Sequence, residues 1–156
     1  MLSLRLNYIV IPLLAVITGS AASYFADSGR AWYGTINLPM WFPSNSVMFP
    51  VWTIILLLSA VSVLIVWNKY SKQKNFYIII GLFILSAIIS VGWNIFFFSH
   101  QQIGLAFIQS VLLISNIILL IVLIWEFCPV AASCLIPYSM WVLFSTVFTF
   151  NVWLMN

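Results

Sequence analysis

The sequence predicts an all-α integral membrane protein, a compact bundle of five transmembrane helices. Of its 156 residues, 65% are hydrophobic and only 4% are charged, which leaves too few polar residues to cover a soluble globule. The charged residues fall at the ends of five long apolar runs. A helix needs about 20 apolar residues to cross the hydrocarbon core of a bilayer. The runs use nearly the whole chain, so we expect residues 1–156 to form a single transmembrane domain.

The first two helices are expected over residues 6–26 and 46–67. The first run follows Arg5 and ends before Asp27. It resembles a signal peptide, but its apolar stretch is longer than usual and four more spans follow, so it is interpreted as a helix. Pro12 should bend it. The second helix can be capped by Ser44 or Asn45, with Pro50 near its first turn, where a missing N–H costs little.

The remaining helices are expected over residues 76–98, 103–126 and 130–154. A lysine-containing loop precedes the first of them, and Glu126 closes the second. Pro137 lies inside the third and should bend it.

Charge predicts the orientation of the bundle. One face carries four positive charges and one negative charge, a sum of +3, from Arg5, Lys69, Lys72, Lys74 and Glu126. The other face carries Asp27 and Arg30, which cancel, and His100. The positive-inside rule therefore places the N-terminus in the cytoplasm and the loop over residues 27–45 outside. The basic balance reflects this orientation, and no nucleic acid partner is expected.

The loop over residues 27–45 is expected to form a lid. It is the one long connection, and it holds two tryptophans, Tyr33, Phe42 and two prolines. A water-facing loop has no packing need for so many aromatic side chains. Prolines restrict its backbone without requiring hydrogen-bond partners, so the loop can lie folded over apolar surface.

Polar and aromatic side chains recur at helical spacing and predict a pocket beneath this loop. Amides and hydroxyls avoid lipid, so such stripes should face the bundle interior. With the expected topology, one polar zone falls in the outer half of the membrane. Its members are Gly19, Ser20, Ser23, Trp52, Trp93, Asn94, Ala106, Gln109, Ser145 and Thr149.

Several of these residues have two interpretations. Trp52, Trp93 and Trp141 lie on the polar stripes, where stacking on a ligand competes with ordinary helix packing. Asn94 and Gln109 could orient a ligand or hydrogen-bond to each other across their helices.

Arg30 also has two possible roles. It could meet a ligand carboxylate, or pair with Asp27 three residues earlier.

Absences in the sequence exclude several classes. No lysine lies within a span, which excludes a Schiff-base retinal protein, and no intramembrane carboxylate exists to carry protons or sodium. No Ser-His-Asp set, metal cluster or Gly-rich phosphate loop is present. Cys128 and Cys134 are expected to be buried free thiols. We therefore expect no conventional enzyme, no metal and no obligatory cofactor.

Motifs along nearly the whole chain resemble the TspO/MBR family, the tryptophan-rich sensory or translocator proteins also called peripheral benzodiazepine receptors. The motifs are Gly19-Ser20, Trp32-Tyr33, Leu38-Pro39-Met40-Trp41-Phe42-Pro43, Phe49-Pro50-Val51-Trp52, Trp93-Asn94 with Phe97-Phe98, Gly104-Leu105-Ala106, and Pro137-Tyr138 with Trp141. They occur in the family's order.

This resemblance implies a pocket under the lid that binds tetrapyrroles such as protoporphyrin IX and isoquinoline carboxamides, in a protein that often forms a homodimer. Carried over to this chain, the pocket is lined or covered by Trp41, Pro43, Met48, Trp52, Trp93, Asn94, Leu105, Ser145 and Phe148. Trp52 and Trp141 would face a bound porphyrin.

Some positions depart from the family pattern. Leu38 replaces a common lysine and Ser44 replaces a proline, which leaves the lid less cationic and less rigid. Ser145 and Thr149 stand at a usual alanine and asparagine. Phe150 replaces the tyrosine of the proposed cholesterol motif, so specific sterol binding is not expected.

The functional expectation is a receptor or sensor in a bacterial plasma membrane that binds tetrapyrroles in this pocket and can pass them across the membrane. The absence of a cleavable presequence favours that location over an organelle. One alternative is a light- and oxygen-dependent porphyrin-degrading enzyme that uses Trp52 and Trp141. Another is a small-solute transporter or a regulatory partner of other membrane proteins.

Overall fold

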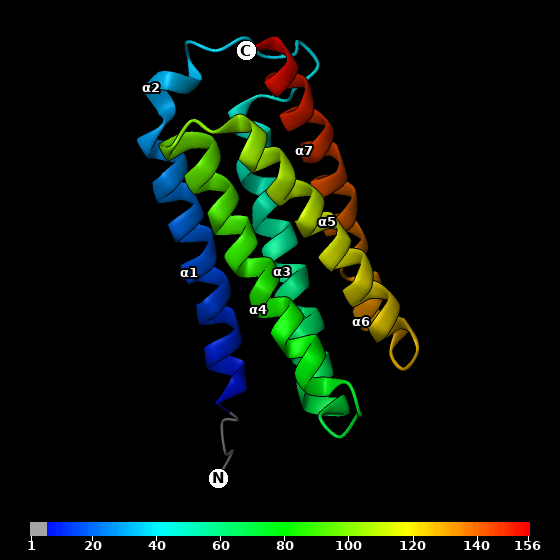
Figure 1. Cartoon of the computed structure of the whole chain (residues 1–156). Helices are drawn as coiled ribbons and strands as arrows, with labels where there is room; N and C mark the ends of the chain where they lie inside the picture. The colour runs from blue at the N-terminus through cyan, green and yellow to red at the C-terminus, as the bar shows by residue number, and fades with distance from the viewer. Residues whose placement is uncertain (1–5) are drawn as a thin grey trace.

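The computed structural model describes residues 6–156, except for the side chains of residues 45 and 46, and it confirms the all-helical fold (Figure 1). Arg5, the expected N-terminal charge, lies outside the described residues. The elements are α1 (Asn7–Ser28), α2 (Arg30–Tyr33), α3 (Asn45–Tyr70), α4 (Phe76–Asn94), a π-helix η1 (Ile95–Ser99), α5 (Ile103–Trp125), α6 (Pro129–Ser133) and α7 (Ile136–Met155).

Five helical segments are long and apolar enough to cross a membrane. They are Asn7–Ser28, Val47–Tyr70, Phe76–Ser99, Ile103–Trp125 and Pro129–Met155. Many large apolar side chains on them are exposed, as a bundle surrounded by lipid requires.

The helices form a ring in which one junction is weak. Helix α1 packs against α3 and α4, α4 packs along α5, and α5 packs along α7. Helix α3 reaches the last span chiefly through α6 and touches α7 little. The long loop and the C-terminus share one end of the bundle, and α6 lies toward the other (Figure 1). Helices α3 and α7 are therefore less tightly packed near the loop.

The last span is two helices rather than the single bent helix expected over residues 130–154. Helix α6 ends at Ser133, and α7 begins at Ile136 with Pro137 in its first turn. A first turn tolerates proline because its N–H groups have no partner within the helix. The buried Ser62 hydroxyl of α3 donates a 2.8 Å hydrogen bond to the Ala131 carbonyl, which ties α3 to α6.

The prolines of the first two spans lie inside helices. Pro12 lies within α1, as the sequence indicates. Helix α3 begins at residue 45, so Pro50 falls one turn deeper than the expected first-turn position.

The span expected over residues 76–98 ends in the π-helix η1, which packs closely on the end of α1. A Cβ added to Gly29 would lie only 2.4 Å from the Phe98 carbonyl oxygen. The hydroxyls of Ser28 and Ser99 are 2.8 Å apart and hydrogen-bonded. This contact fixes the start of the long loop relative to η1.

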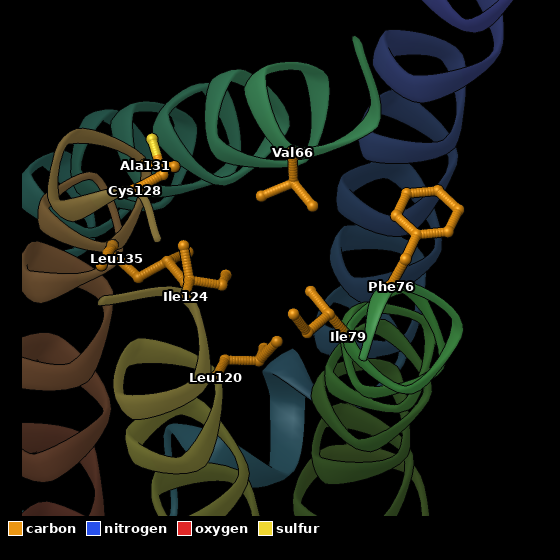
Figure 2. Packing of buried hydrophobic residues seen from close by; sticks show 9 residues of the cluster. Val66, Phe76, Ile79, Leu120, Ile124, Cys128, Ala131 and Leu135 are labelled. Atoms are coloured by element: carbon orange, nitrogen blue, oxygen red, sulfur yellow. The ribbon is translucent and has the colours of Figure 1, made fainter. Parts of the chain in front are cut away.

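A buried apolar cluster holds the end of the bundle opposite the long loop. Figure 2 shows Val66 of α3, Ile79 of α4 and Leu120 and Ile124 of α5 in this cluster. The buried Cys128 also belongs to it.

The interior between α4 and α5 also contains a polar contact. The Asn116 amide of α5 donates to the Ser86 hydroxyl at 2.7 Å and to the Leu82 carbonyl at 2.9 Å. These bonds satisfy the amide away from water and join the two helices.

Candidate functional site

The long loop after α2, residues 34–44, crosses the end of the bundle to α7 and returns to α3 (Figure 1). We call it the lid loop. The Asn37 backbone N–H donates to the Asn156 side-chain oxygen at 2.9 Å, and the Asn156 amide donates to the Asn37 carbonyl at 3.0 Å. The lid loop is therefore fastened to the end of α7.

The side chains beneath the lid loop form an aromatic cluster built from α2, the lid loop, α4, η1, α5 and α7. Its buried members are Phe97, Ala106, Phe148 and Val152, and the partly buried side chains packed on them are Trp32, Tyr33, Ile36, Leu38, Phe42, Trp93, Phe96, Phe98 and Ile103. Burial raises the pKa of the Tyr33 phenol.

Two stacked pairs define the centre of the aromatic cluster. The rings of Phe42 and Phe148 have centroids 3.6 Å apart and planes 21° apart. The Trp93 and Phe97 rings stack at 4.8 Å and 13°. The site therefore already stacks flat rings against one another.

A second group of side chains links α3, α4 and α7. The Ser90 and Tyr138 hydroxyls are hydrogen-bonded at 2.8 Å. Trp52 lies edge-on to Tyr138 at 6.3 Å, and both belong to an apolar cluster that also contacts Trp141. The Asn94 amide donates to the Ser90 carbonyl one turn back in its own helix at 2.9 Å.

Three polar atoms in this region are buried without a hydrogen-bond partner among the described residues. They are Trp93 Nε1, Trp141 Nε1 and Gln109 Oε1, and Ser59 Oγ is in the same condition further along α3. The Gln109 amide lies against Gly92, where an added Cβ would be 3.0 Å from Oε1. The Asn94 amide thus bonds to its own helix, and the Gln109 oxygen has no partner among the described residues. Neither observation shows the hydrogen bond between Asn94 and Gln109 that was one of the two expected alternatives.

Two hollows open on the side of the bundle along α7. One of about 420 Å³ lies between α3 and α7 and is lined by Val51, Ile54, Ile55, Pro137, Met140, Trp141 and Phe144. The other, about 450 Å³, is lined by Trp41, Met140, Leu143, Phe144 and Val147. Both are shallow, have apolar linings and open on the side of the bundle that lipid would surround.

The predicted site residues fall into four groups. Trp93, Ala106 and Phe148 lie in the aromatic cluster, and Trp52 and Trp141 lie in the group below it. Partly buried positions are held by Pro43, Met48, Asn94, Gln109 and Ser145. Exposed positions are held by Ser20, Trp41 and Leu105, although Trp41 remains edge-on to Phe144 and Phe148.

Arg30 is ion-paired with Asp27 at 2.7 Å, and both side chains are largely exposed. Of the two roles expected for Arg30, the structure therefore shows the ion pair with Asp27. Within residues 6–156, no group of three or more histidine, cysteine or acidic side chains is arranged to hold a metal ion.

Phe42, Phe144 and Tyr138 belong to the site but were not predicted as site residues. Phe144 and Phe148 are four residues apart, a spacing that places them on one helix face, and this signal could have identified Phe144. The inward direction of Phe42 has no comparable signal, because the loop has no periodicity.

The fold and site define a class: an integral membrane protein whose transmembrane bundle has an aromatic interior closed by a tryptophan-containing loop. The sequence model of the TspO/MBR family matches residues 8–154, and the chain belongs to this family. Its bacterial members and five potential spans support location in the bacterial plasma membrane.

Relatives in three domains of life are similar over most of the chain. The chain is 31% identical to the tryptophan-rich protein TspO of Bacillus cereus over 81% of this chain and 82% of that protein. It is 30% identical to the tryptophan-rich protein TspO of Archaeoglobus fulgidus over 95% and 96% of the two chains. It is 26% identical to the translocator protein of Homo sapiens over 95% and 87%.

Proposed function

We propose that this protein is a membrane receptor or sensor that binds tetrapyrroles such as protoporphyrin IX beneath the lid loop. The observation that carries the proposal is a set of buried polar atoms without a partner among the described residues: Trp93 Nε1 in the aromatic cluster, Trp141 Nε1 in the apolar cluster around Tyr138, and Gln109 Oε1. A buried polar group without a partner costs about 1–3 kcal/mol, so a ligand that satisfies these atoms would gain affinity.

A tetrapyrrole has complementary chemistry. Its faces are flat and apolar and can stack on indole and phenyl rings. Its imine nitrogens and carboxylates accept hydrogen bonds from indole N–H groups such as those of Trp93 and Trp141. Its pyrrole N–H groups point into the centre of the ring, so they could donate to the Gln109 oxygen only across a face of the porphyrin. One molecule of this class therefore offers both kinds of partner.

The proposal includes the orientation that charge predicts, with the lid loop outside. The ligand carboxylates would then lie toward water at the lid end. Arg30 would donate hydrogen bonds to one of them, because its exposed ion pair with Asp27 contributes little to stability and is easily broken.

Pairing of two copies and passage of the ligand across the membrane also belong to the proposal. The name of the human relative, translocator protein, is consistent with passage. Neither is needed for the binding test.

The test is a dark titration of protoporphyrin IX into the protein in lipid nanodiscs, with the Soret band as readout. We expect saturable binding that Trp93→Phe and Trp141→Phe each weaken about threefold to tenfold, because phenylalanine keeps a ring but lacks the N–H. Trp67→Phe is the matched control, since Trp67 packs on Phe76 in the opposite end of the bundle. Equal affinities in all three variants would reject the assigned contacts.

A further inference from the structure

The side chain of Phe42 is held like a bound ligand. Its ring is stacked on Phe148 at 3.6 Å and is nearly parallel, at 10°, to the Phe144 ring 6.0 Å away. Phe144 and Phe148 are one turn apart on α7, and Phe148 is only 2% exposed. The two α7 rings therefore form one surface that accepts a flat aromatic ring, which we call the ring seat.

Phe42 enters the ring seat from a short turn that begins at Pro39. The Phe42 N–H donates to the Pro39 carbonyl at 3.1 Å, which closes the turn. Met40 is fully exposed, whereas Trp41, 48% exposed, lies edge-on to both rings of the seat. Withdrawal of the Phe42 ring would therefore move this turn together with Trp41 and the buried Pro39, and the helices would not have to separate.

The ring seat also adjoins the side openings of the bundle. Phe144 lines the hollow between α3 and α7 as well as the hollow beside Trp41. A flat apolar molecule that moves along α7 from the bilayer would meet Phe144 first, and the surface occupied by Phe42 next.

We propose that the ring seat is a subsite for one planar aromatic ring of the ligand, and that Phe42 occupies it until the ligand displaces it. The identity of the ligand rests on the proposed tetrapyrrole function, whereas the ring seat itself does not. The opposite arrangement, in which Phe42 stays in place and covers a ligand bound elsewhere, predicts the opposite effect of removing its ring.

Removal of the Phe42 ring should strengthen binding. When a protein's own side chain occupies the binding surface most of the time, a ligand can bind only to the fraction of molecules in which the surface is free. The apparent dissociation constant is then the intrinsic one divided by that fraction. From the usual strength of an aromatic pair, we expect Phe42→Ala to lower the dissociation constant of protoporphyrin IX about threefold to tenfold. Met40→Ala, in the same turn but outside the cluster, should leave it unchanged. Phe42→Leu keeps apolar bulk without a flat ring and replaces the alanine variant if that one does not fold.

A second measurement tests the ring seat without a porphyrin. Indole is added to each variant in nanodiscs, and the midpoint of thermal unfolding is followed. Indole should raise the midpoint of Phe42→Ala saturably and leave wild type and Met40→Ala unchanged, because only the first has an unoccupied seat.

The outcomes separate the two claims. Tighter porphyrin binding by Phe42→Ala supports displacement, and weaker or unchanged binding overturns it. If no variant binds porphyrin saturably, the proposed function fails, and the indole experiment alone tests the ring seat. Selective stabilisation of Phe42→Ala by indole then supports the ring seat, and equal effects on all variants overturn it.

Discussion

Gly29 is expected to be the glycine least tolerant of substitution in this protein. Its φ of −100° is accessible to any residue, so backbone conformation does not require glycine. The requirement comes from space, because an added Cβ would lie 2.4 Å from the Phe98 carbonyl oxygen and 2.7 Å from its carbonyl carbon. These are backbone atoms of η1 and cannot rotate away. Gly29→Ala must therefore push α1 and η1 apart.

The size of the effect follows from the rigidity of the neighbour. Overpacking typically costs about 1–3 kcal/mol, and contact with backbone favours the upper end. In a soluble protein of about this length, each 1 kcal/mol shifts the unfolding midpoint by roughly 2–4 °C. We therefore expect Gly29→Ala to lower the midpoint by roughly 6–12 °C.

The assay is thermal unfolding of purified variants in one detergent. Gly81→Ala is the matched control, since an added Cβ there has nothing within 4 Å and alanine favours a helix over glycine by about 1 kcal/mol. It should be neutral or stabilising. A Gly29→Ala midpoint equal to that of Gly81→Ala would refute the inferred contact between α1 and η1.

Two further predictions concern buried hydrogen bonds. Ser62→Ala should destabilise the protein by about 1–3 kcal/mol, because the Ala131 carbonyl loses the bond that joins α3 to α6. Ser133→Ala removes an exposed hydroxyl of α6, the helix that also holds Ala131, and should have little effect in the same unfolding assay. Equal losses of stability in Ser62→Ala and Ser133→Ala would contradict the prediction. Asn116→Leu should cost a similar amount, because it removes both bonds to α4. The companion variant Asn116→Gln, whose longer amide could still reach the Ser86 hydroxyl, should recover part of the loss in thermal unfolding.

The sequence was most informative where physical constraints are long-range and simple. The length of the apolar runs sufficed to predict five spans, because a bilayer imposes a fixed helix length. The break between α6 and α7 could not be predicted, because Pro137 is compatible with both a bent helix and a helix start. The tertiary bond from Ser62 to Ala131 is a contact that no local pattern reveals.

Helical spacing indicated which side chains face the bundle interior, but not the contacts that they make. Helical spacing placed Trp93 and Gln109 toward the interior, and both are partly buried. It could not decide that the Asn94 amide bonds to its own helix, since rotamer choice depends on the neighbours. Nor could it place Phe42 in the ring seat, because the lid loop has no repeating pattern. The π-helical end of the third span is likewise invisible to a pattern based on 3.6 residues per turn.

The most direct test of the central claim is the stoichiometry of protoporphyrin IX binding to the wild-type protein in nanodiscs in the dark. The account predicts a shifted Soret band and tryptophan quenching that saturate together at about one porphyrin per chain, as stacking on Trp93 and its neighbours requires. A signal that rises linearly with porphyrin and equals that of empty nanodiscs would contradict it.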